Sequence, residues 1–355
     1  MAAFEYQSYG QRVVFGAGNA RAALAAEVER LSGARILLIV ADAEHDVARA
    51  LTEGLPVAAT FTGVRPHVPA AVAAAVRAVA ADSGADVVVS VGGGSTTGTA
   101  KAVAMTTGLP IVAVPTTYAG SEATAVWGVT DAGRKTTGTH PAVLPRAVVY
   151  DPDLTMSLPV DLTVASGLNA LAHCVDSLWA PNANPVSSAL AVAGVRALRD
   201  GLPAVRRDAA DRAARESLLY GAYLAALSFA GAGSGLHHKI CHVLGGTWDL
   251  PHAETHAVLL PHVLALNADH AAAATARVAA ALGETDAVDG LLRLHDDLAA
   301  PRTLRSLGMP ESGLAEAVDL VVAAAPDDNP APVTPTSVRG LLERAWSGAP
   351  PQRAR

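Results

Sequence analysis

Pairs of residues four apart, two of them His–His and one Asn–His, are the part of this sequence best suited to chemistry. Residues four apart share one face of an α-helix, and three pairs have this spacing: Asn169 with His173, His238 with His242, and His252 with His256. Imidazole binds metal ions and exchanges protons near neutral pH. A lone buried histidine is more often a hydrogen-bonded core residue, but three pairs in an apolar chain are costly to bury without purpose. The spacing therefore predicts one functional pocket built on helices.

Other polar residues lie close to these pairs in the sequence. Asp176 stands seven residues after Asn169, two helical turns along the same face. Lys239 lies between the histidines of the second pair and is a candidate for binding an anionic substrate, with a solvated surface charge as the alternative. The same two interpretations apply to Arg134 and Lys135 of an expected hairpin.

The cysteines and the remaining histidines carry weaker signals. Cys174 and Cys241 each adjoin a histidine, and we interpret both as small packing residues rather than thiolate ligands or nucleophiles. With no secretion signal in the sequence, we do not expect them to form a disulfide. His237, His262 and His140 have no special spacing, and we expect them at the surface or behind the pocket.

A glycine loop is the second feature that predicts chemistry. Gly92, Gly93, Gly94 and Ser95 follow an expected strand and open a helix that carries Lys101. Backbone N–H groups and a helix N-terminus would converge there on a phosphate. The spacing is neither GxGxxG nor a Walker A loop, so a tight turn without a ligand is the alternative.

Residues after two further strands favour a dinucleotide at this loop. Asp42 stands just past an expected strand, where a carboxylate accepts hydrogen bonds from the adenosine ribose, although a helix N-cap is the alternative. Thr116 and Thr117 follow another strand, and their hydroxyls would line the same crevice. Because Asp42 would repel a ribose phosphate, we expect NADH in preference to NADPH.

Alternating strands and helices predict that residues 1–155 form an α/β nucleotide-binding domain with a parallel sheet. Short apolar runs indicate buried strands, and Ala-rich segments with helical periodicity indicate the helices that cover them. The expected strands are Arg35–Val40, Asp86–Val91, Pro110–Val114 and Ala147–Tyr150, the expected helices include Ala43–Glu53 and Pro69–Ala81, and Val126–Thr137 is an expected hairpin around Asp131-Ala132-Gly133.

The pattern changes after Asp151-Pro152, where β-branched runs end and long Ala- and Leu-rich helical segments begin. Residues 156–355 are therefore expected to form an all-helical catalytic domain. Pro159 is expected near the start of its first helix, Pro181–Pro185 after that helix, and the turn-rich segment Pro326–Pro335 before the last helix.

Composition narrows the classes of partner. The chain has 355 residues, of which 51% are hydrophobic and 17% charged, and its formal net charge is -7, which argues against disorder and against a nucleic-acid surface. Two uncharged stretches, Ala102–Ser121 and Ser217–Leu236, approach the ~20 residues of a membrane span. Their prolines and glycines favour buried loops and close helix packing instead. We expect a cytoplasmic enzyme with a small-molecule substrate and no membrane partner.

Over nearly its full length the chain resembles the iron-containing alcohol dehydrogenase superfamily. The resemblance rests on the glycine loop, on Pro115-Thr116-Thr117 and on the order of the histidine segments. Within the superfamily, three segments look like the maleylacetate reductases: Ser166–His173, Gly235–His242 and Leu250–His256. The resemblance implies a homodimer that reduces maleylacetate, a dicarboxylate, to 3-oxoadipate with NADH or NADPH during the breakdown of resorcinol, hydroxyquinol and chlorinated aromatics.

The implied reaction suggests roles for the pocket residues. Hydride adds to the conjugated double bond of maleylacetate, charge develops on the ketone oxygen as an enolate, and a proton is then delivered to carbon. The expected catalytic residues are His173, His238 and His252, which would hydrogen-bond the enolate and a carboxylate, and His242, which would donate the proton. The expected substrate-binding residues are Asn169, Lys239 and His256.

In the metal-dependent relatives an Asp and three His hold the ion, and their positions match Asn169, His173, His238 and His252 here. The Asp has become Asn, so this ligand set loses its only formal negative charge and should hold a divalent cation much less tightly. We therefore expect a vestigial site without a catalytic metal, although the spacing from His238 to His252 is retained.

Three other functions are alternatives to this interpretation. A metal-dependent alcohol or polyol dehydrogenase on the same scaffold would need the full ligand set, which Asn169 interrupts. A lyase related to dehydroquinate synthase shares the two-domain layout, but the segment Pro251–His256 argues against it. A binding protein without activity would not need so many titratable groups beside a nucleotide loop.

Overall fold

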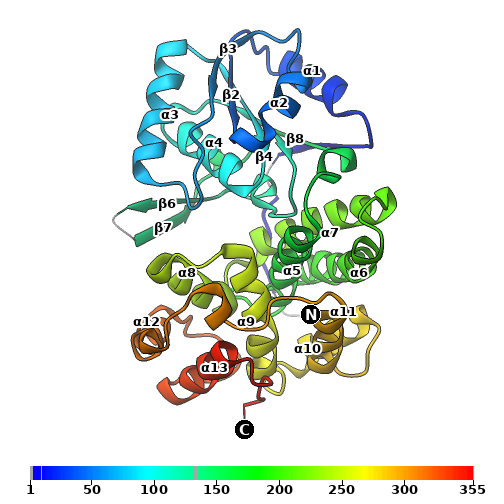
Figure 1. Ribbon diagram of the computed structural model, residues 1–355, viewed down its shortest axis with the longest axis vertical. Coiled ribbons are helices and arrows are strands. Elements are labelled where there is room, and N and C mark those ends of the chain that lie inside the picture. The colour runs from blue at the N-terminus through cyan, green and yellow to red at the C-terminus, as the bar shows by residue number, and fades with distance from the viewer. Residues whose placement is uncertain (1–2, 9, 132–133, 355) are drawn as a thin grey trace. The chain divides into compact units, whose positions relative to one another are not determined.

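The computed structural model describes residues 3–8, 10–131 and 134–354, and the chain divides into two compact units (Figure 1). One unit spans Ser8–Leu158, and the other spans Pro159–Arg355 together with the N-terminal segment up to Gln7. The division after residue 155 that the sequence suggested lies three residues before Leu158.

A six-stranded parallel sheet forms the centre of the first unit, with the strand order β1-β8-β5-β4-β2-β3. Its strands are β1 (Arg12–Phe15), β2 (Ile36–Val40), β3 (Val57–Phe61), β4 (Val87–Gly92), β5 (Ile111–Pro115) and β8 (Ala147–Tyr150). The helices around it are α1 (Ala20–Arg30), α2 (His45–Leu51), α3 (Ala70–Ser83) and α4 (Gly94–Thr107). Every residue of the four inner strands is buried, as expected for a parallel sheet covered on both faces.

The covering helices divide between the two faces of the sheet, as Figure 1 also shows. Leu24 of α1 and Leu51 of α2 belong to the core on one face, whereas Val76 of α3 and Val103 of α4 belong to the core on the other. The chain therefore turns to opposite faces after the adjacent strands β2 and β4. In open parallel sheets, ligands bind beyond the carboxyl ends of the strands at such a switch point.

The predicted fold class is confirmed, and the four expected strands and two expected helices match the structure to within a few residues. Strands β1 and β3 were missed because they lie at the sheet edges, where partial exposure interrupts the apolar run. The expected hairpin consists of β6 (Val126–Asp131) and β7 (Arg134–Thr139), paired antiparallel. Its turn residues Ala132 and Gly133 lie outside the described residues.

Helices are the regular secondary structure found among the described residues of the second unit, and loops connect them. Its helices are α5 (Val160–Asp176), α6 (Pro185–Arg207), α7 (Arg212–Ala232), α8 (Leu236–Trp248), α9 (His252–Asn267), α10 (Ala272–Leu282), α11 (Ala287–Asp297), α12 (Leu314–Ala324) and α13 (Pro335–Ser347). Helix α5 packs against α6, α7 and α9. A Cβ added at Gly194 would lie 2.7 Å from Cys174 Sγ, so Cys174 fills a tight helix contact as expected for a packing residue.

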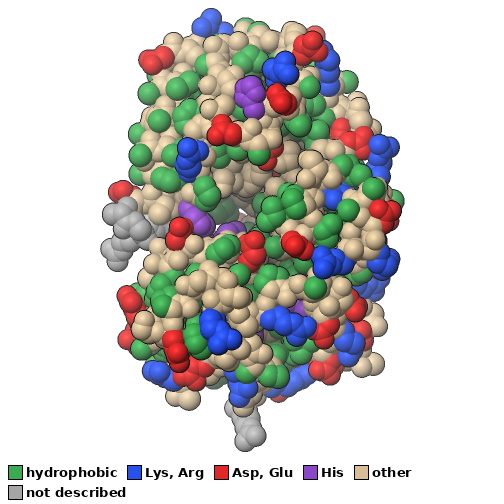
Figure 2. Space-filling model, in the orientation of Figure 1, with side chains coloured by type: hydrophobic (Ala, Val, Ile, Leu, Met, Phe, Trp, Pro, Cys, Tyr) green, Lys and Arg blue, Asp and Glu red, His purple; other side chains and the backbone are tan. Residues whose placement is uncertain are grey.

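The two cysteines are free and buried, and no helix in the described part of the chain is both long and apolar enough to cross a bilayer. On the face drawn in Figure 2, Lys and Arg side chains are interspersed with Asp and Glu side chains. No extended basic patch appears on that face.

A buried lysine connects α4 to the loop after β5. Lys101 Nζ donates hydrogen bonds to the carbonyl oxygens of Ser121, Thr124 and Val126 at 2.6 to 2.8 Å. Burial lowers the pKa of Lys101 to about 7, and the charge of Glu122 opposes this shift. The hydrogen bonds hold the loop that begins with the threonines after β5.

Replacing Lys101 with Met should lower the free energy of unfolding by about 3 kcal/mol, because three buried carbonyl oxygens lose their donor. Urea unfolding followed by circular dichroism measures this change. Arg77→Met is the matched control, since Arg77 donates one hydrogen bond from α3 to Ala102 O of α4 and its loss should cost about 1 kcal/mol. Equal losses for the two variants would show that Lys101 is not an anchor.

Candidate active site

The glycine loop after β4 has a backbone that only glycine can supply. Gly92 has a φ of +146°, and a Cβ there would lie 2.5 Å from Thr96 Oγ1. Gly93 is the N-cap of α4 and provides no side chain to cap it, and a Cβ there would lie 3.0 Å from Thr117 Cγ2. The first N–H groups of α4 therefore lack a capping side chain and can bind an anion.

The other residues expected to bind the cofactor lie at the same edge of the sheet. Val40 at the end of β2 pairs with Val91 of β4, and Gly92 pairs with Pro115 at the end of β5. Asp42 and Thr116 follow these strand ends directly, so the three neighbouring strands bring their loops together. This edge is the switch point described above.

Asp42 is exposed and begins a single 3-10 turn, Asp42–Glu44. The N-caps of this turn and of α2 are Ala41 and Glu44, and neither helix start receives a side-chain cap hydrogen bond. The helix-cap alternative for Asp42 therefore has no support in the structure, and its carboxylate is accessible to a ribose.

Three histidines of the second unit form an inner, buried layer. His237 and His238 on α8 and His256 on α9 are at most 2% exposed, and their ring centroids lie 4.9 to 5.3 Å apart. His237 Nε2 lies 2.9 Å from His256 Nδ1, within hydrogen-bond distance, and Cys241 Sγ lies 3.6 Å from His237 Nε2.

The other three histidines of the predicted pocket are half-buried and cover this layer. His173 stacks on His238 with ring centroids 4.9 Å apart, and the His252 ring lies 4.5 Å from that of His256. His242 is nearly parallel to His252 at 6.4 Å. The structure thus brings together all five histidines of the three spaced pairs.

Asp176 orients one of the inner imidazoles. Its carboxylate lies 2.7 Å from His238 Nδ1 and accepts hydrogen bonds from the Gly235 N–H and the Trp179 Nε1–H. Burial raises the pKa of Asp176, whereas these N–H donors favour its ionised form. With the proton of His238 on Nδ1, the buried Nε2 presents a lone pair that has no partner among the described residues.

Gly235 lets α8 begin directly against this carboxylate. A Cβ at Gly235 would lie 2.5 Å from Asp176 Oδ1, so any larger residue would push α8 away from α5. Phe229 of α7 packs on the rings of His173 and His238 with centroids 5.0 and 4.6 Å away. The His238 imidazole therefore contacts both the Asp176 carboxylate and the Phe229 ring.

This burial keeps the imidazoles neutral. Desolvation lowers the pKa of His237 to about 3, and desolvation together with the nearby charge of Lys239 lowers that of His238 to about 3. Desolvation also lowers the pKa values of His173 and His256 well below the usual value for histidine. Neutral imidazoles offer one N–H donor and one lone pair each, so their tautomers decide what they can bind.

Sequence spacing missed His237, which was expected at the surface or behind the pocket and is a member of the inner layer. His237 is four residues before Cys241, and this spacing was not weighed because Cys241 was interpreted as packing. His262 is also buried, whereas His140 is exposed. Asp176 was noticed only as a polar residue on the His173 face.

Asn169 and Lys239 differ in how the structure places them. Asn169 is 3% exposed, and its Oδ1 has no hydrogen-bond partner among the described residues, so it can bind a ligand. Lys239 is half-buried, and its ammonium group makes no hydrogen bond or ion pair within the described part of the chain. The side chains of Arg134 and Lys135 lie outside the described residues.

The donor atoms allow one compact metal-ligand group among the described residues. The ligand atoms of His237, Cys241 and His256 lie within 4.8 Å of one another. His173, His238 and His252, the histidines of the expected vestigial site, are not a group within that distance in the described structure.

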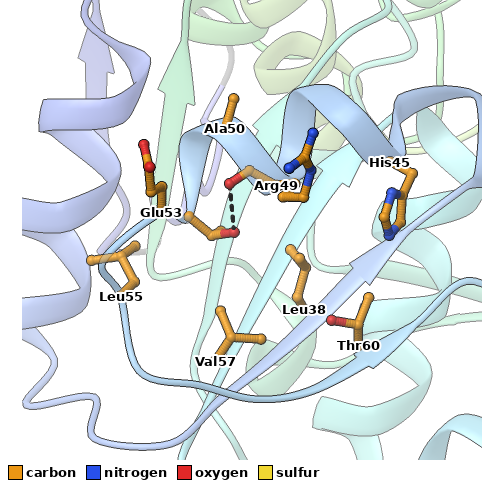
Figure 3. A pocket seen from close by; sticks show the side chains of 9 residues that line it. Leu38, His45, Arg49, Ala50, Glu53, Leu55, Val57 and Thr60 are labelled. Atoms are coloured by element: carbon orange, nitrogen blue, oxygen red, sulfur yellow. Dashed lines mark hydrogen bonds between the residues drawn. The ribbon is translucent and has the colours of Figure 1, made fainter.

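A separate cavity of about 480 Å³ lies along α2 in the first unit (Figure 3). His45, Arg49 and Glu53 line it, together with apolar residues of β2 and β3. The Glu53 carboxylate is paired with Arg21 at 2.9 Å. None of the residues expected to bind the cofactor lines this cavity, so we assign it no role.

Comparisons with known proteins show the family of the chain. Residues 10–152 match the family described as iron-containing alcohol dehydrogenase, and residues 163–346 match the C-terminal part of the Fe-containing alcohol dehydrogenase family. A maleylacetate reductase of Sphingobium indicum is 45% identical over 98% of this chain and 99% of its own length.

Solved structures show the same fold. The chain is 53% identical to an iron-containing alcohol dehydrogenase from Corynebacterium glutamicum, with a TM-score of 0.95 over 98% of this chain and 97% of that one. It is 43% identical to a maleylacetate reductase from Agrobacterium tumefaciens, with a TM-score of 0.93 over 99% and 100% of the two chains.

The buried histidines predict that the protein loses stability in mild acid. Their folded pKa values of about 3 to 4 lie below the ordinary value near 6.5, so unfolding takes up protons between pH 6.5 and 4, and the free energy of unfolding falls as the pH decreases. The histidines with such values are His237, His238, His262 and His295. Asp176 and Glu122, whose pKa values burial raises, act in the opposite direction.

Each such histidine should contribute on the order of 1 kcal/mol per pH unit in this window. Urea unfolding at pH 7, 6, 5 and 4.5 measures the slope. His295→Gln, which lies outside the histidine layers, should reduce the slope by about one histidine's share. A free energy of unfolding that stays constant from pH 7 to 4.5 would contradict the prediction.

Proposed function

Because the chain belongs to the iron-containing alcohol dehydrogenase family, with curated maleylacetate reductases 40 to 45% identical over nearly its whole length, we propose that it reduces maleylacetate to 3-oxoadipate with NADH. The reaction consumes one hydride from NADH and one proton, and it saturates the carbon-carbon double bond conjugated to the ketone.

Asn169 is the observation that carries this proposal. The family resemblance matches it to an Asp of metal-dependent relatives, and it presents a buried, neutral amide oxygen on the same helix as His173. Metal-dependent dehydrogenases polarise a simple carbonyl or alcohol with a metal ion, which a carboxylate ligand helps to hold. A conjugated alkene can accept hydride with hydrogen-bond donors at the ketone oxygen alone.

The first unit fits a dinucleotide. A Cβ at Gly92 or Gly93 would fill the space beside the uncapped start of α4, which suits the close approach of a pyrophosphate. When bound, NADH would supply the hydride. Asp42 would accept hydrogen bonds from the ribose and would repel a ribose phosphate, which supports NADH over NADPH.

The donor set beside Asn169 lacks a free carboxylate for a divalent cation. The Asp176 carboxylate is occupied by the N–H groups of His238, Gly235 and Trp179, which leaves only neutral donors. The family to which the chain belongs is named for iron, so its membership does not support a metal-free site. The absence of a catalytic metal is part of our proposal and needs a direct test.

The residues of the second unit would then act as follows. We assign the donors that stabilise the enolate to His173 and His252, because His238 in the tautomer held by Asp176 can accept but not donate at Nε2. His242 is half-buried and can exchange protons with solvent, which suits the donor of the proton to carbon. Asn169, His256 and Lys239 are the proposed contacts for the carboxylates.

Exhaustive chelation followed by an assay with maleylacetate and NADH tests both parts of the proposal. The nicotinamide absorbance should fall as fast after chelation as before it, since no step uses a metal. If activity returns only with added iron or zinc, the reductase function stands and the metal-free mechanism is wrong. An inert mixture, with or without metal, would reject the reductase.

Asn169→Asp is the matched variant for this assay. It restores the carboxylate of the metal-dependent relatives and should tighten zinc binding at least about tenfold, measured by titration calorimetry. It should also slow metal-free reduction, because a second buried anion faces the developing enolate. Unchanged zinc affinity would show that Asn169 does not belong to a vestigial ligand set.

Replacing Gly92 with Ala should weaken NADH binding at least about tenfold, because a Cβ would meet Thr96 and shift the loop that receives the pyrophosphate. Fluorescence titration with NADH measures the dissociation constant. Gly108→Ala is the control, since Gly108 also has a positive φ of +71° but has nothing within 4 Å of an added Cβ. If both variants bind NADH equally well, the loop is not the phosphate site.

A metal-dependent alcohol dehydrogenase is the second candidate, favoured by the 53% identity to an iron-containing alcohol dehydrogenase. It would oxidise simple alcohols or reduce aldehydes with added metal while leaving maleylacetate unchanged. The cytoplasmic location and the homodimer implied by the resemblance are also proposals, and light scattering of the purified protein tests the dimer.

A further inference from the structure

The contact between His237 and His256 has no role in the mechanism above. It joins two fully buried imidazoles on different helices, α8 and α9, with His237 Nε2 and His256 Nδ1 2.9 Å apart. The remaining ring nitrogens, His237 Nδ1 and His256 Nε2, are buried and have no hydrogen-bond partner among the described residues. One proton must lie between the two rings for this hydrogen bond to form.

The position of Cys241 favours one of the two rings as the carrier of that proton. Its Sγ also lies within hydrogen-bond distance of His237 Nε2, at 3.6 Å. If Nε2–H is the donor, it serves both acceptors, the His256 Nδ1 lone pair and the weakly accepting sulfur. If Nε2 is the acceptor, its single lone pair is taken by the His256 N–H, and the thiol can donate to Nε2 only by competing for that lone pair, which is the poorer arrangement. The geometry therefore favours the proton on His237 Nε2.

The position of this proton also fixes the tautomer of His256. When His237 donates to Nδ1 of a neutral His256, the proton of His256 must be on Nε2. That N–H has no partner within the described structure, and its ring lies 4.5 Å from His252 and 6.3 Å from His173. His256 thus presents a donor among the residues assigned to the substrate.

We propose that His237 is a positioning residue for the reduction, holding His256 in the tautomer and orientation that point an Nε2–H at an oxygen of the dicarboxylate substrate. Asp176 acts in the opposite sense on His238, whose Nε2 carries a lone pair. His237 thus makes His256 a donor at Nε2, and Asp176 makes His238 an acceptor at Nε2. This inference rests on the proposed function for the identity of the substrate but not for the tautomer itself.

The same three residues form the compact metal-ligand group, and the 2.9 Å contact distinguishes the two possibilities. A bound ion would need lone pairs on both nitrogens, whereas a hydrogen bond leaves a proton on one of them. The separation is a normal hydrogen-bond length, so we assign it to a hydrogen bond. Metal analysis of the purified protein checks this assignment.

A long-range proton–nitrogen NMR spectrum of the protein labelled with ¹⁵N-histidine tests the tautomer without substrate. His237 and His256 should each carry their proton on Nε2, with Nδ1 of His256 shifted as a hydrogen-bond acceptor. Loss of one signal set in His256→Gln assigns the resonances. A proton on Nδ1 of His256, or one metal ion per chain bound through Cys241, would overturn the proposal.

Two amide variants separate positioning from packing. Gln at position 237 can place an N–H near the position of Nε2, whereas Asn carries the same group on a shorter side chain that cannot reach His256. His237→Gln should retain kcat within about fivefold of wild type, and His237→Asn should lose on the order of 30-fold with unchanged NADH affinity. Cys241→Ala, which removes only the weaker acceptor, should change kcat by less than about threefold.

Equal activity of His237→Gln and His237→Asn would show that His237 only packs and would overturn the proposal. Wild-type turnover of maleylacetate is the reference for both variants. If the wild type does not reduce maleylacetate, the proposed function fails, and the tautomer spectrum still decides whether His237 orients His256.

Discussion

The site in the helical unit depends on burying several imidazoles beside a single carboxylate. Asp176 receives three N–H groups, one of them from His238, and the start of α8 at Gly235 is shaped to meet it. Because desolvation keeps the surrounding histidines neutral, their hydrogen-bond partners rather than their charges determine which nitrogen faces the substrate. The contact of the Asp176 carboxylate with α8 thus brings α8 close to α5 and also fixes which nitrogen of His238 carries the proton.

The nucleotide edge of the first unit depends on a different constraint, the absence of side chains. Gly92 has a backbone conformation closed to other residues, and Gly93 packs against Thr117 of the neighbouring loop. Lys101, on the helix α4 that begins at this loop, holds the loop after β5 through three carbonyl oxygens. Close packing at Gly92 and Gly93 therefore shapes the glycine loop, and the hydrogen bonds of Lys101 fix the loop after β5.

Much of the fold could be predicted from the sequence because burial on both faces leaves an unmistakable apolar run, as in Ile36–Val40 and Ile111–Pro115. The edge strands Arg12–Phe15 and Val57–Phe61 were missed because their residues are exposed or only partly buried, so the apolar run is broken. Among the site residues, helical spacing identified five histidines. It could not identify His237, whose partner His256 lies on another helix.

The sequence by itself determined which residue types are available: a neutral Asn169 one helical turn before His173, glycines after one strand, and paired histidines on helices. Only the tertiary structure decided their protonation and orientation. Residues four apart along a helix share a face, but the tautomer of an imidazole depends on the atom opposite it. For His238 that atom belongs to Asp176 on α5, and for His256 it belongs to His237 on α8. Those contacts exist only once the helices have packed.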